Sequence, residues 1–192
     1  MRAYPRSQSM CLVYLQLLDV MQKEDIRTLR ELNRKGKVDV RRIRNLPYYH
    51  AIILARSEMG RRNLYKLVSE SHLNYFKARP RIPKSLLSEC RNGLLLGTAC
   101  SAGELYQAIL SNRSDAEIAS IIDFYDYLEI QPTGNNAYLV RDHISGITCE
   151  EDLRNINRRI VKLGEQFHKP VVATCDVHFL NPEDEIYRRI IQ

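Results

Sequence analysis

The 192-residue sequence predicts an α/β fold in which short apolar strands alternate with amphipathic helices. Two observations support this prediction. Apolar runs of strand length recur from residue 50 onward, and each is followed by a stretch with apolar residues at helical spacing. Because these runs are almost continuously apolar, they favour a parallel sheet or barrel that is covered on both faces.

The N-terminal segment is expected to be an isolated amphipathic helix. Apolar residues recur at helical spacing between residues 11 and 33, with charged residues between them. Residues 35–47 are basic and polar, which is typical of a linker. The sequence therefore divides into a helical segment over residues 1–34, a basic linker over 35–47 and an α/β domain over 48–192.

Four strands and five helices are expected within the α/β domain. The strands are expected over residues 50–55, 93–99, 127–130 and 170–174, and the helices after residue 60 and from residues 101, 114, 148 and 181. Ser114 with Glu117, and Thr148 with Glu151, have the spacing of capping boxes. Asn181 followed by Pro182 and two acidic residues predicts the start of the last helix.

The composition excludes several classes of protein. With 44% hydrophobic and 27% charged residues, the chain is too apolar for a disordered protein. It has no apolar run of the ~18–20 residues that a membrane span requires, and its start lacks the apolar stretch of a signal peptide. The five cysteines are odd in number and form no C-x-x-C pair, which favours reduced thiols. We therefore expect a soluble, cytoplasmic protein without membrane contact.

Positive charge is concentrated in one stretch of the chain. Residues 35–84 contain thirteen Lys or Arg and only three acidic residues, within a net charge of +6 for the whole chain. Such a block favours a polyanionic partner such as DNA, and a solvated basic face is the alternative. Residues 75–84 interleave aromatic and cationic side chains, which suits either a nucleic-acid-facing loop or a packed connector. The candidate nucleic-acid-binding residues are Lys77, Arg79, Arg81 and Lys84.

Candidate metal ligands stand where predicted strands end. Asp176 and His178 follow the fourth strand, and residues two apart in an extended segment project to the same side. Cys100 follows the second strand directly before a helix, whose N-terminus favours a thiolate. His50 lies at the edge of the first strand. Because loops beyond strand C-termini carry ligands in parallel α/β folds, these residues are candidates for one site. The alternative is a capped turn, a buried cysteine and hydrogen-bonded histidines.

No catalytic residue is identified from sequence motifs. The phosphate-binding, dinucleotide-binding, zinc-protease and serine-hydrolase motifs are all absent from the sequence. Asp123, Asp126 and Glu129 resemble a carboxylate cluster. The first two lie at a helix-to-strand connection and are expected to be solvated.

Six segments in succession are similar to one family. They are residues 50–60, 63–72, 79–83, 97–105, 127–132 and 172–180. Together they resemble the PHP (polymerase and histidinol phosphatase) domain of PolC-type DNA polymerase III, the replicative polymerase of low-GC Gram-positive bacteria. The helical segment before the linker resembles the last helix of the proofreading exonuclease that is inserted in that domain.

This resemblance implies part of a distorted β/α barrel with a multi-metal site. His50, Cys100, Asp176 and His178 match ligands of the second half of that site, for divalent ions such as Zn, Mn or Mg. The first-half ligands and the polymerase module have no counterpart in this sequence. The resemblance therefore implies a fragment of a DNA-directed DNA polymerase, with DNA and the remaining polymerase segments as partners. A stand-alone metal-dependent phosphoesterase and a non-catalytic scaffold domain are the alternatives.

Overall fold

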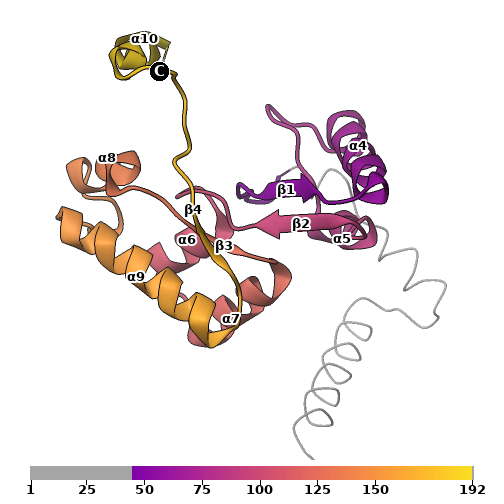
Figure 1. Ribbon diagram of the computed structural model, residues 1–192, viewed down its shortest axis with the longest axis horizontal. Helices are drawn as coiled ribbons and strands as arrows, with labels where there is room; N and C mark the ends of the chain where they lie inside the picture. The colour runs from indigo at the N-terminus through magenta and orange to yellow at the C-terminus, as the bar shows by residue number, and fades with distance from the viewer. Residues whose placement is uncertain (1–44, 192) are drawn as a thin grey trace, which may run out of the picture. The chain divides into compact units, whose positions relative to one another are not determined.

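The computed structural model describes residues 45–191, and a compact unit of the chain begins at Pro47 (Figure 1). The predicted helix over residues 11–33 and most of the predicted linker lie outside the described residues. The strands are β1 (Ile52–Ala55), β2 (Leu94–Gly97), β3 (Leu128–Ile130) and β4 (Val171–Ala173). The α-helices are α4 (Glu58–Leu73), α5 (Lys84–Glu89), α6 (Glu104–Leu110), α7 (Asp115–Phe124), α8 (Ala137–Arg141), α9 (Glu150–Gln166) and α10 (Glu185–Ile191). Three short 3₁₀ helices complete the set: η1 (Thr133–Asn136), η2 (Ile144–Gly146) and η3 (Pro182–Asp184). The predicted α/β content is confirmed.

The strands form two short pairs of opposite type. β1 pairs with β2 antiparallel, whereas β3 pairs with β4 parallel. The expectation of an all-parallel sheet is therefore wrong for the first pair. An apolar run indicates that a strand is buried but not whether it runs parallel or antiparallel to its neighbour. The direction of a strand depends on the route of the chain that connects it to the neighbouring strand. Two helices and a proline-containing loop join β1 to β2, where a parallel pair is usually joined by a single crossover helix.

Side chains join the two strand pairs where the backbone ladder ends. A single parallel bridge connects Gly97 to Tyr127, at the start of β3. Beyond it, the hydroxyl of Thr98 accepts the backbone N–H of Glu129 at 2.9 Å. On the other side of the bridge, Asp126 accepts the backbone N–H of Leu96 at 2.7 Å. All four strands are thus linked in the order β1, β2, β3, β4 by main-chain and side-chain hydrogen bonds.

The contacts of Asp126 correct the expectation that it is solvated. Its carboxylate is partly buried, and it forms an ion pair with Arg91 at 3.0 Å in addition to its bond with Leu96. A partly buried carboxylate at the end of a strand pair is held in place by the hydrogen bond that it accepts from a backbone N–H group. Asp126 is therefore a structural residue of the β2–β3 junction.

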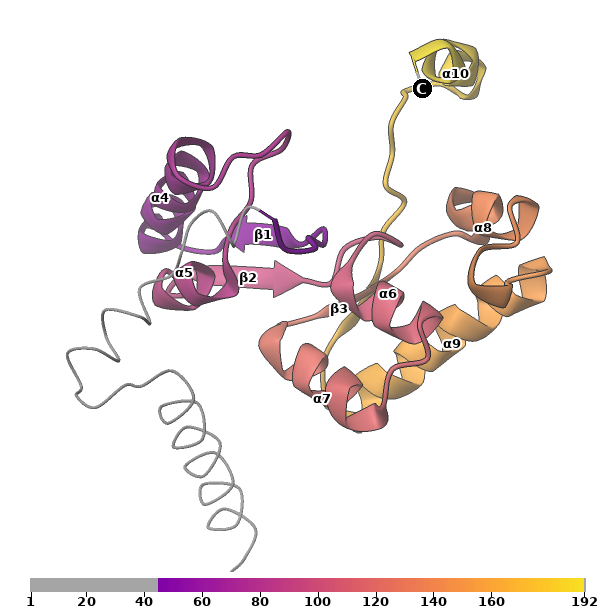
Figure 2. The same cartoon turned by 180° about the vertical axis from the view of Figure 1, so that it is seen from behind.

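The core lies between the strands and the helices that cover them. α4 packs against β1 and β2, and α9 packs against β3 and β4 (Figure 2). The most deeply buried side chains include Leu67 of α4, Leu96 of β2, Ile122 of α7, Leu128 of β3 and Ile160 of α9. This core holds β2 and β3 side by side, with the loops that follow them on one edge.

Side-chain capping marks the starts of α4, α7 and α9, whereas α5, α6 and α8 begin without a side-chain cap. The predicted capping box of Ser114 and Glu117 is confirmed at the start of α7, and Asn181 caps the last helical segment through Asp184. The predicted box at α9 is wrong by one residue. Cys149 is the N-cap, and Asp152 accepts the backbone N–H groups of Thr148 and Cys149. These two backbone bonds lower the pKa of the Asp152 carboxyl.

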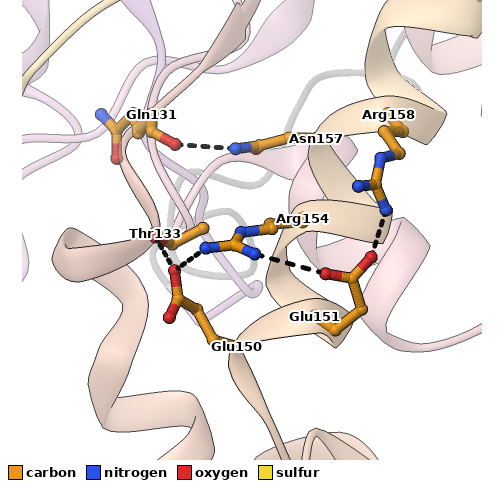
Figure 3. Close-up of polar contacts among 7 residues, drawn as sticks. All are labelled: Gln131, Thr133, Glu150, Glu151, Arg154, Asn157 and Arg158. Atoms are coloured by element: carbon orange, nitrogen blue, oxygen red, sulfur yellow. Dashed lines mark hydrogen bonds and ion pairs between the residues drawn. The ribbon is translucent and has the colours of Figure 1, made fainter.

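A polar network anchors the first turns of α9 to the loop after β3 (Figure 3). Glu150 accepts a hydrogen bond from Thr133 at 3.0 Å and pairs with Arg154 at 2.8 Å. One turn later, Asn157 donates to the carbonyl oxygen of Gln131 at 2.8 Å. This network places η1 beside the end of β4, where Asn135 donates to the carbonyl oxygen of Cys175 at 2.7 Å.

One face of the strands carries exposed apolar side chains. Ile52 and Leu54 of β1 are 38% and 48% exposed, and Val172 of β4 is 38% exposed. Among residues 45–191, β1 pairs along one edge only. An apolar strand with an open edge is a template for association with another chain.

We expect the isolated chain to self-associate through this face at micromolar concentration. Leu54→Lys places a charge on the face and should shift the sedimentation-velocity profile toward monomer. Leu73→Lys, at an exposed position at the end of α4, is the matched control and should leave the profile unchanged. A wild-type chain that sediments as a monodisperse monomer would contradict this expectation.

Candidate metal centre

His50 and Cys100 are brought together from residues far apart in the sequence. The Nδ1 of His50 lies 3.5 Å from the Sγ of Cys100. His50 is held by a parallel bridge to Gly103, and its backbone N–H donates to the carbonyl oxygen of Ala102 at 3.0 Å. The two side chains therefore form a nitrogen–sulfur pair of the kind that binds zinc and other borderline divalent ions.

The turn that presents Cys100 depends on a glycine and on a strained alanine. An added Cβ at Gly103 would lie 2.0 Å from the carbonyl oxygen of Thr98, so only glycine fits there. Ala99, directly before Cys100, has a left-handed backbone with φ of 59°. Such a conformation costs a non-glycine residue roughly 1–2 kcal/mol and persists only where surrounding contacts impose it.

Asp176 and His178 lie on the exposed segment that follows β4. Asp176 also has a left-handed backbone, with φ of 48°, which aspartate tolerates better than most residues. The Nδ1 of His178 lies 2.5 Å from the carbonyl oxygen of Asp176. Since a carbonyl only accepts, Nδ1 carries the proton in this contact, which leaves Nε2 as the ring nitrogen that could bind a metal ion.

The four predicted ligands form two separate pairs. No group of three or more His, Cys, Asp or Glu side chains with metal-binding geometry occurs in the part of the chain that the structure describes. The donor set of imidazole, thiolate and carboxylate suits a divalent ion. His50 and Cys100 provide two adjacent ligands, and Asp176 and His178 are not gathered around them.

A cavity of about 350 Å³ opens beside His50. It is lined by Tyr48, Tyr49, His50, Arg79, Ala102 and Gln107. It thus places one of the predicted nucleic-acid-binding cations, Arg79, at the same cavity as a predicted metal ligand. A guanidinium at this position favours an anionic group in the cavity.

The other predicted cations have contacts within the chain. Lys84 forms an ion pair with Glu104 at 2.6 Å, and its ammonium lies 4.6 Å from the centre of the Phe124 ring. The guanidinium of Arg81 lies 4.6 Å from the centre of the Tyr48 ring. Lys77 and Arg79 are joined by a bridge around a tight turn. The segment is therefore partly a packed connector, which was one of the two interpretations of its sequence.

The comparisons with known proteins decide the family. The PHP domain family matches residues 11–133 of the chain, which is more than half of its length. The chain belongs to the PHP domain family. The match starts at residue 11, within the segment predicted from sequence to be helical, and ends in η1.

Many curated relatives of this PHP chain are PolC-type DNA polymerases. It is 52% identical over 169 residues to the "DNA polymerase III PolC-type" of Clostridium perfringens, a match that covers 87% of this chain and 11% of the relative. The relative from Caldanaerobacter subterraneus is 43% identical over 177 residues, with 90% and 12% covered. The relative from Bacillus subtilis is 47% identical over 143 residues, with 74% and 10% covered. The resemblance seen in the six sequence segments is confirmed, and the chain spans about a tenth of the length of these relatives.

A buried acid of the PHP chain was not singled out as a site residue from sequence. Glu129 is 5% exposed, and both its carboxylate oxygens accept hydrogen bonds, from the backbone N–H of Ala99 and the hydroxyl of Thr174. Burial and the Glu129 carboxylate together raise the pKa of the neighbouring Tyr127 phenol to about 12. The available signal was a charged residue inside an apolar strand, since buried acids are rare without partners.

Of the helices between residues 45 and 191, none is both long and apolar enough to cross a membrane.

Proposed function

We propose that this chain is part of a PolC-type replicative DNA polymerase and contributes a metal-binding portion of its PHP domain to DNA replication. Its similarity to the PolC-type relatives supports the assignment. The proposed metal binding is supported by the contact between His50 and Cys100, two residues of metal-binding types that lie 50 positions apart in the sequence. DNA-directed DNA polymerisation and exonuclease activity would belong to the whole polymerase.

We propose the domain boundaries predicted from the sequence. Residues 48–192 would be the C-terminal part of the PHP domain, since a compact unit begins at Pro47. Residues 35–47 would be the linker, and residues 1–34 the end of the inserted exonuclease. The PHP family match begins at residue 11 and therefore includes most of this N-terminal segment.

Four side chains would hold a divalent ion. His50 and Cys100 would provide nitrogen and sulfur, and the segment after β4 would provide the Asp176 carboxylate and Nε2 of His178. A bound divalent ion would supply a Lewis acid or an activated water, or would stabilise the domain by cross-linking its loops. Zn, Mn and Mg are all consistent with such a site, and the thiolate favours Zn.

Metal binding by the full chain tests this proposal directly. Zn²⁺ retained after equilibrium dialysis is measured for the wild type and for Cys100→Ala, Asp176→Ala and His178→Ala. Each variant should lower the affinity for Zn²⁺ at least tenfold, because each removes a ligand. Cys149→Ser keeps the N-cap of α9 and removes an exposed thiol elsewhere, so it should bind Zn²⁺ as the wild type does. Unchanged Zn²⁺ content in all three ligand variants would refute the site.

A second candidate function is a stand-alone metal-dependent phosphoesterase. The cavity shared by His50, Arg79 and Gln107 favours it, since a guanidinium beside a metal ligand would bind a phosphate group. Hydrolysis of p-nitrophenyl phosphate by the chain, lost in Asp176→Ala, would support this function. Chelation that lowers the melting temperature without any such activity would support a non-catalytic scaffold instead.

DNA and the other polymerase segments are the proposed partners. The basic residues Lys77, Arg79, Arg81 and Lys84 would contact phosphate or acidic segments of the polymerase. Arg79 is the strongest candidate, because it lines the cavity beside His50, whereas Lys84 is neutralised by Glu104. Sequencing the DNA on both sides of the reading frame tests whether this chain is part of such a polymerase. An exonuclease upstream and a polymerase module downstream would support the assignment, and unrelated flanking genes would contradict it.

A further inference from the structure

We propose that Glu129 is a positioning residue that ties the loop carrying Cys100 to the segment carrying Asp176 and His178. This inference rests on the proposed metal site and adds a residue that is not among its ligands. Glu129 lies in β3, between the two strands whose ends carry the ligands.

The two oxygens of Glu129 reach the two ligand-bearing segments separately. Oε1 accepts the backbone N–H of Ala99 at 3.3 Å, and Ala99 directly precedes Cys100. Oε2 accepts the hydroxyl of Thr174 at 2.9 Å, two residues before Asp176. A single side chain therefore links segments that are 75 residues apart in the sequence (residues 99 and 174).

The surroundings of Glu129 are built to hold a carboxylate. Burial of an acid is costly unless hydrogen bonds replace its water, and both oxygens of Glu129 are bonded. An added Cβ at Gly97 would lie 2.5 Å from Oε1 and equally close to the Tyr127 hydroxyl, so the glycine leaves the space that the carboxylate fills. No ion pair involves Glu129 within residues 45–191, so charge pairing does not account for its burial there.

The backbone on both sides of this link needs to be held in place. Ala99 has a left-handed backbone, as does Asp176, and such conformations persist where neighbouring contacts impose them. The bond from the Ala99 N–H to Glu129 is a contact of this kind. Since Cys100 and Asp176 follow closely, loss of Glu129 should loosen both ligand segments together.

The test compares three variants and one control variant of the full chain, first without metal and then with Co²⁺. Glu129→Gln keeps the shape but replaces one accepting oxygen with an NH2 group, so neither bond to a carboxylate remains and the links to Ala99 and Thr174 are both weakened. Thr174→Val removes only the Thr174 link, and Thr174→Ser restores the hydroxyl. Glu104→Gln is the matched control, because the Glu104 side chain is also largely buried but bonds to Lys84 and Tyr125 and to neither ligand segment.

Amide hydrogen exchange is the first measurement. In Glu129→Gln, exchange should accelerate at least tenfold in peptides spanning residues 96–102 and 171–178, and Glu104→Gln should leave both peptides unchanged. Thr174→Val should accelerate exchange in residues 171–178, and Thr174→Ser should return it to the wild-type rate. Unchanged exchange in Glu129→Gln, or equal acceleration in Glu104→Gln, would overturn the proposal.

The second measurement is a titration with Co²⁺ alone, monitored by the absorption band of the Co²⁺–thiolate bond. Glu129→Gln should weaken Co²⁺ binding at least tenfold relative to the wild type, as loss of outer-shell partners does, whereas Glu104→Gln should stay within twofold. Wild-type affinity in Glu129→Gln would overturn the positioning role. If exchange rises in both peptides but the wild type shows no Co²⁺–thiolate band, the link by Glu129 is supported and the proposed metal site is what fails.

Discussion

Gly60→Ala is expected to destabilise the chain by about 2 kcal/mol or more, although the same change usually stabilises a helix by about 1 kcal/mol. Gly60 lies in the first turn of α4, and an added Cβ there would be 1.8 Å from the carbonyl oxygen of Gly93. That carbonyl cannot move freely, because it accepts the backbone N–H of Arg56 at 2.9 Å and belongs to a residue with φ of 75°. The helix and the turn before β2 would have to separate.

Urea denaturation followed by circular dichroism measures this effect. Gly134→Ala is the matched control, because no atom lies within 4 Å of its added Cβ. It should change the free energy of unfolding by less than about 0.5 kcal/mol. A Gly60→Ala chain as stable as the wild type would show that α4 does not pack against the β2 turn as described.

Stability is expected to fall steeply as the pH rises from about 10 to about 12. Burial, with a smaller contribution from Tyr138, raises the pKa of the Tyr106 phenol to about 12 in the folded chain. Burial and then the Glu104 carboxylate raise the pKa of Tyr125 as well. Unfolded tyrosines lose their protons near pH 10, so between these values the unfolded state is favoured by proton release. Below pH 10 both states hold the protons and this contribution is constant.

The expected loss is on the order of 2 kcal/mol for Tyr106 alone by pH 12, which is a large part of the stability of a typical domain. Denaturant melts at several pH values measure it. Tyr106→Phe should flatten the alkaline decline, although it also removes the acceptor for Asn136 and so lowers stability at neutral pH. Tyr187→Phe, at an exposed position of α10, should leave the decline unchanged. A decline as steep in Tyr106→Phe as in the wild type would contradict the assignment.

Sequence reasoning missed the direction of the first strand pair, the burial of two acids and the short helices α5 and α8. Apolar runs located all four strands to within about two residues, and capping residues located α7, α9 and α10. The antiparallel pairing of β1 with β2 follows from the route of the chain through α4 and α5, which periodicity does not report. Asp126 and Glu129 appear in sequence as ordinary acids, and only their long-range hydrogen bonds distinguish them.

The candidate site also has a part that the sequence identified and a part that only the structure revealed. The sequence identified His50, Cys100, Asp176 and His178 through position after strands and through resemblance, and the contact of His50 with Cys100 agrees with that grouping. It did not identify the cavity beside His50 or the role proposed for Glu129. Both depend on residues from several elements meeting in space.

By itself, the sequence determined the α/β class, the order of the four strands and of five helices, and the PHP family, because apolar runs, caps and motif segments are local and each acts over a few residues. Only the tertiary structure decided how the strands pair, which acids are buried and which candidate ligands meet. The reason is physical: these features rest on bonds between residues 30, 45 and 50 positions apart, whose formation depends on the packing of the whole core.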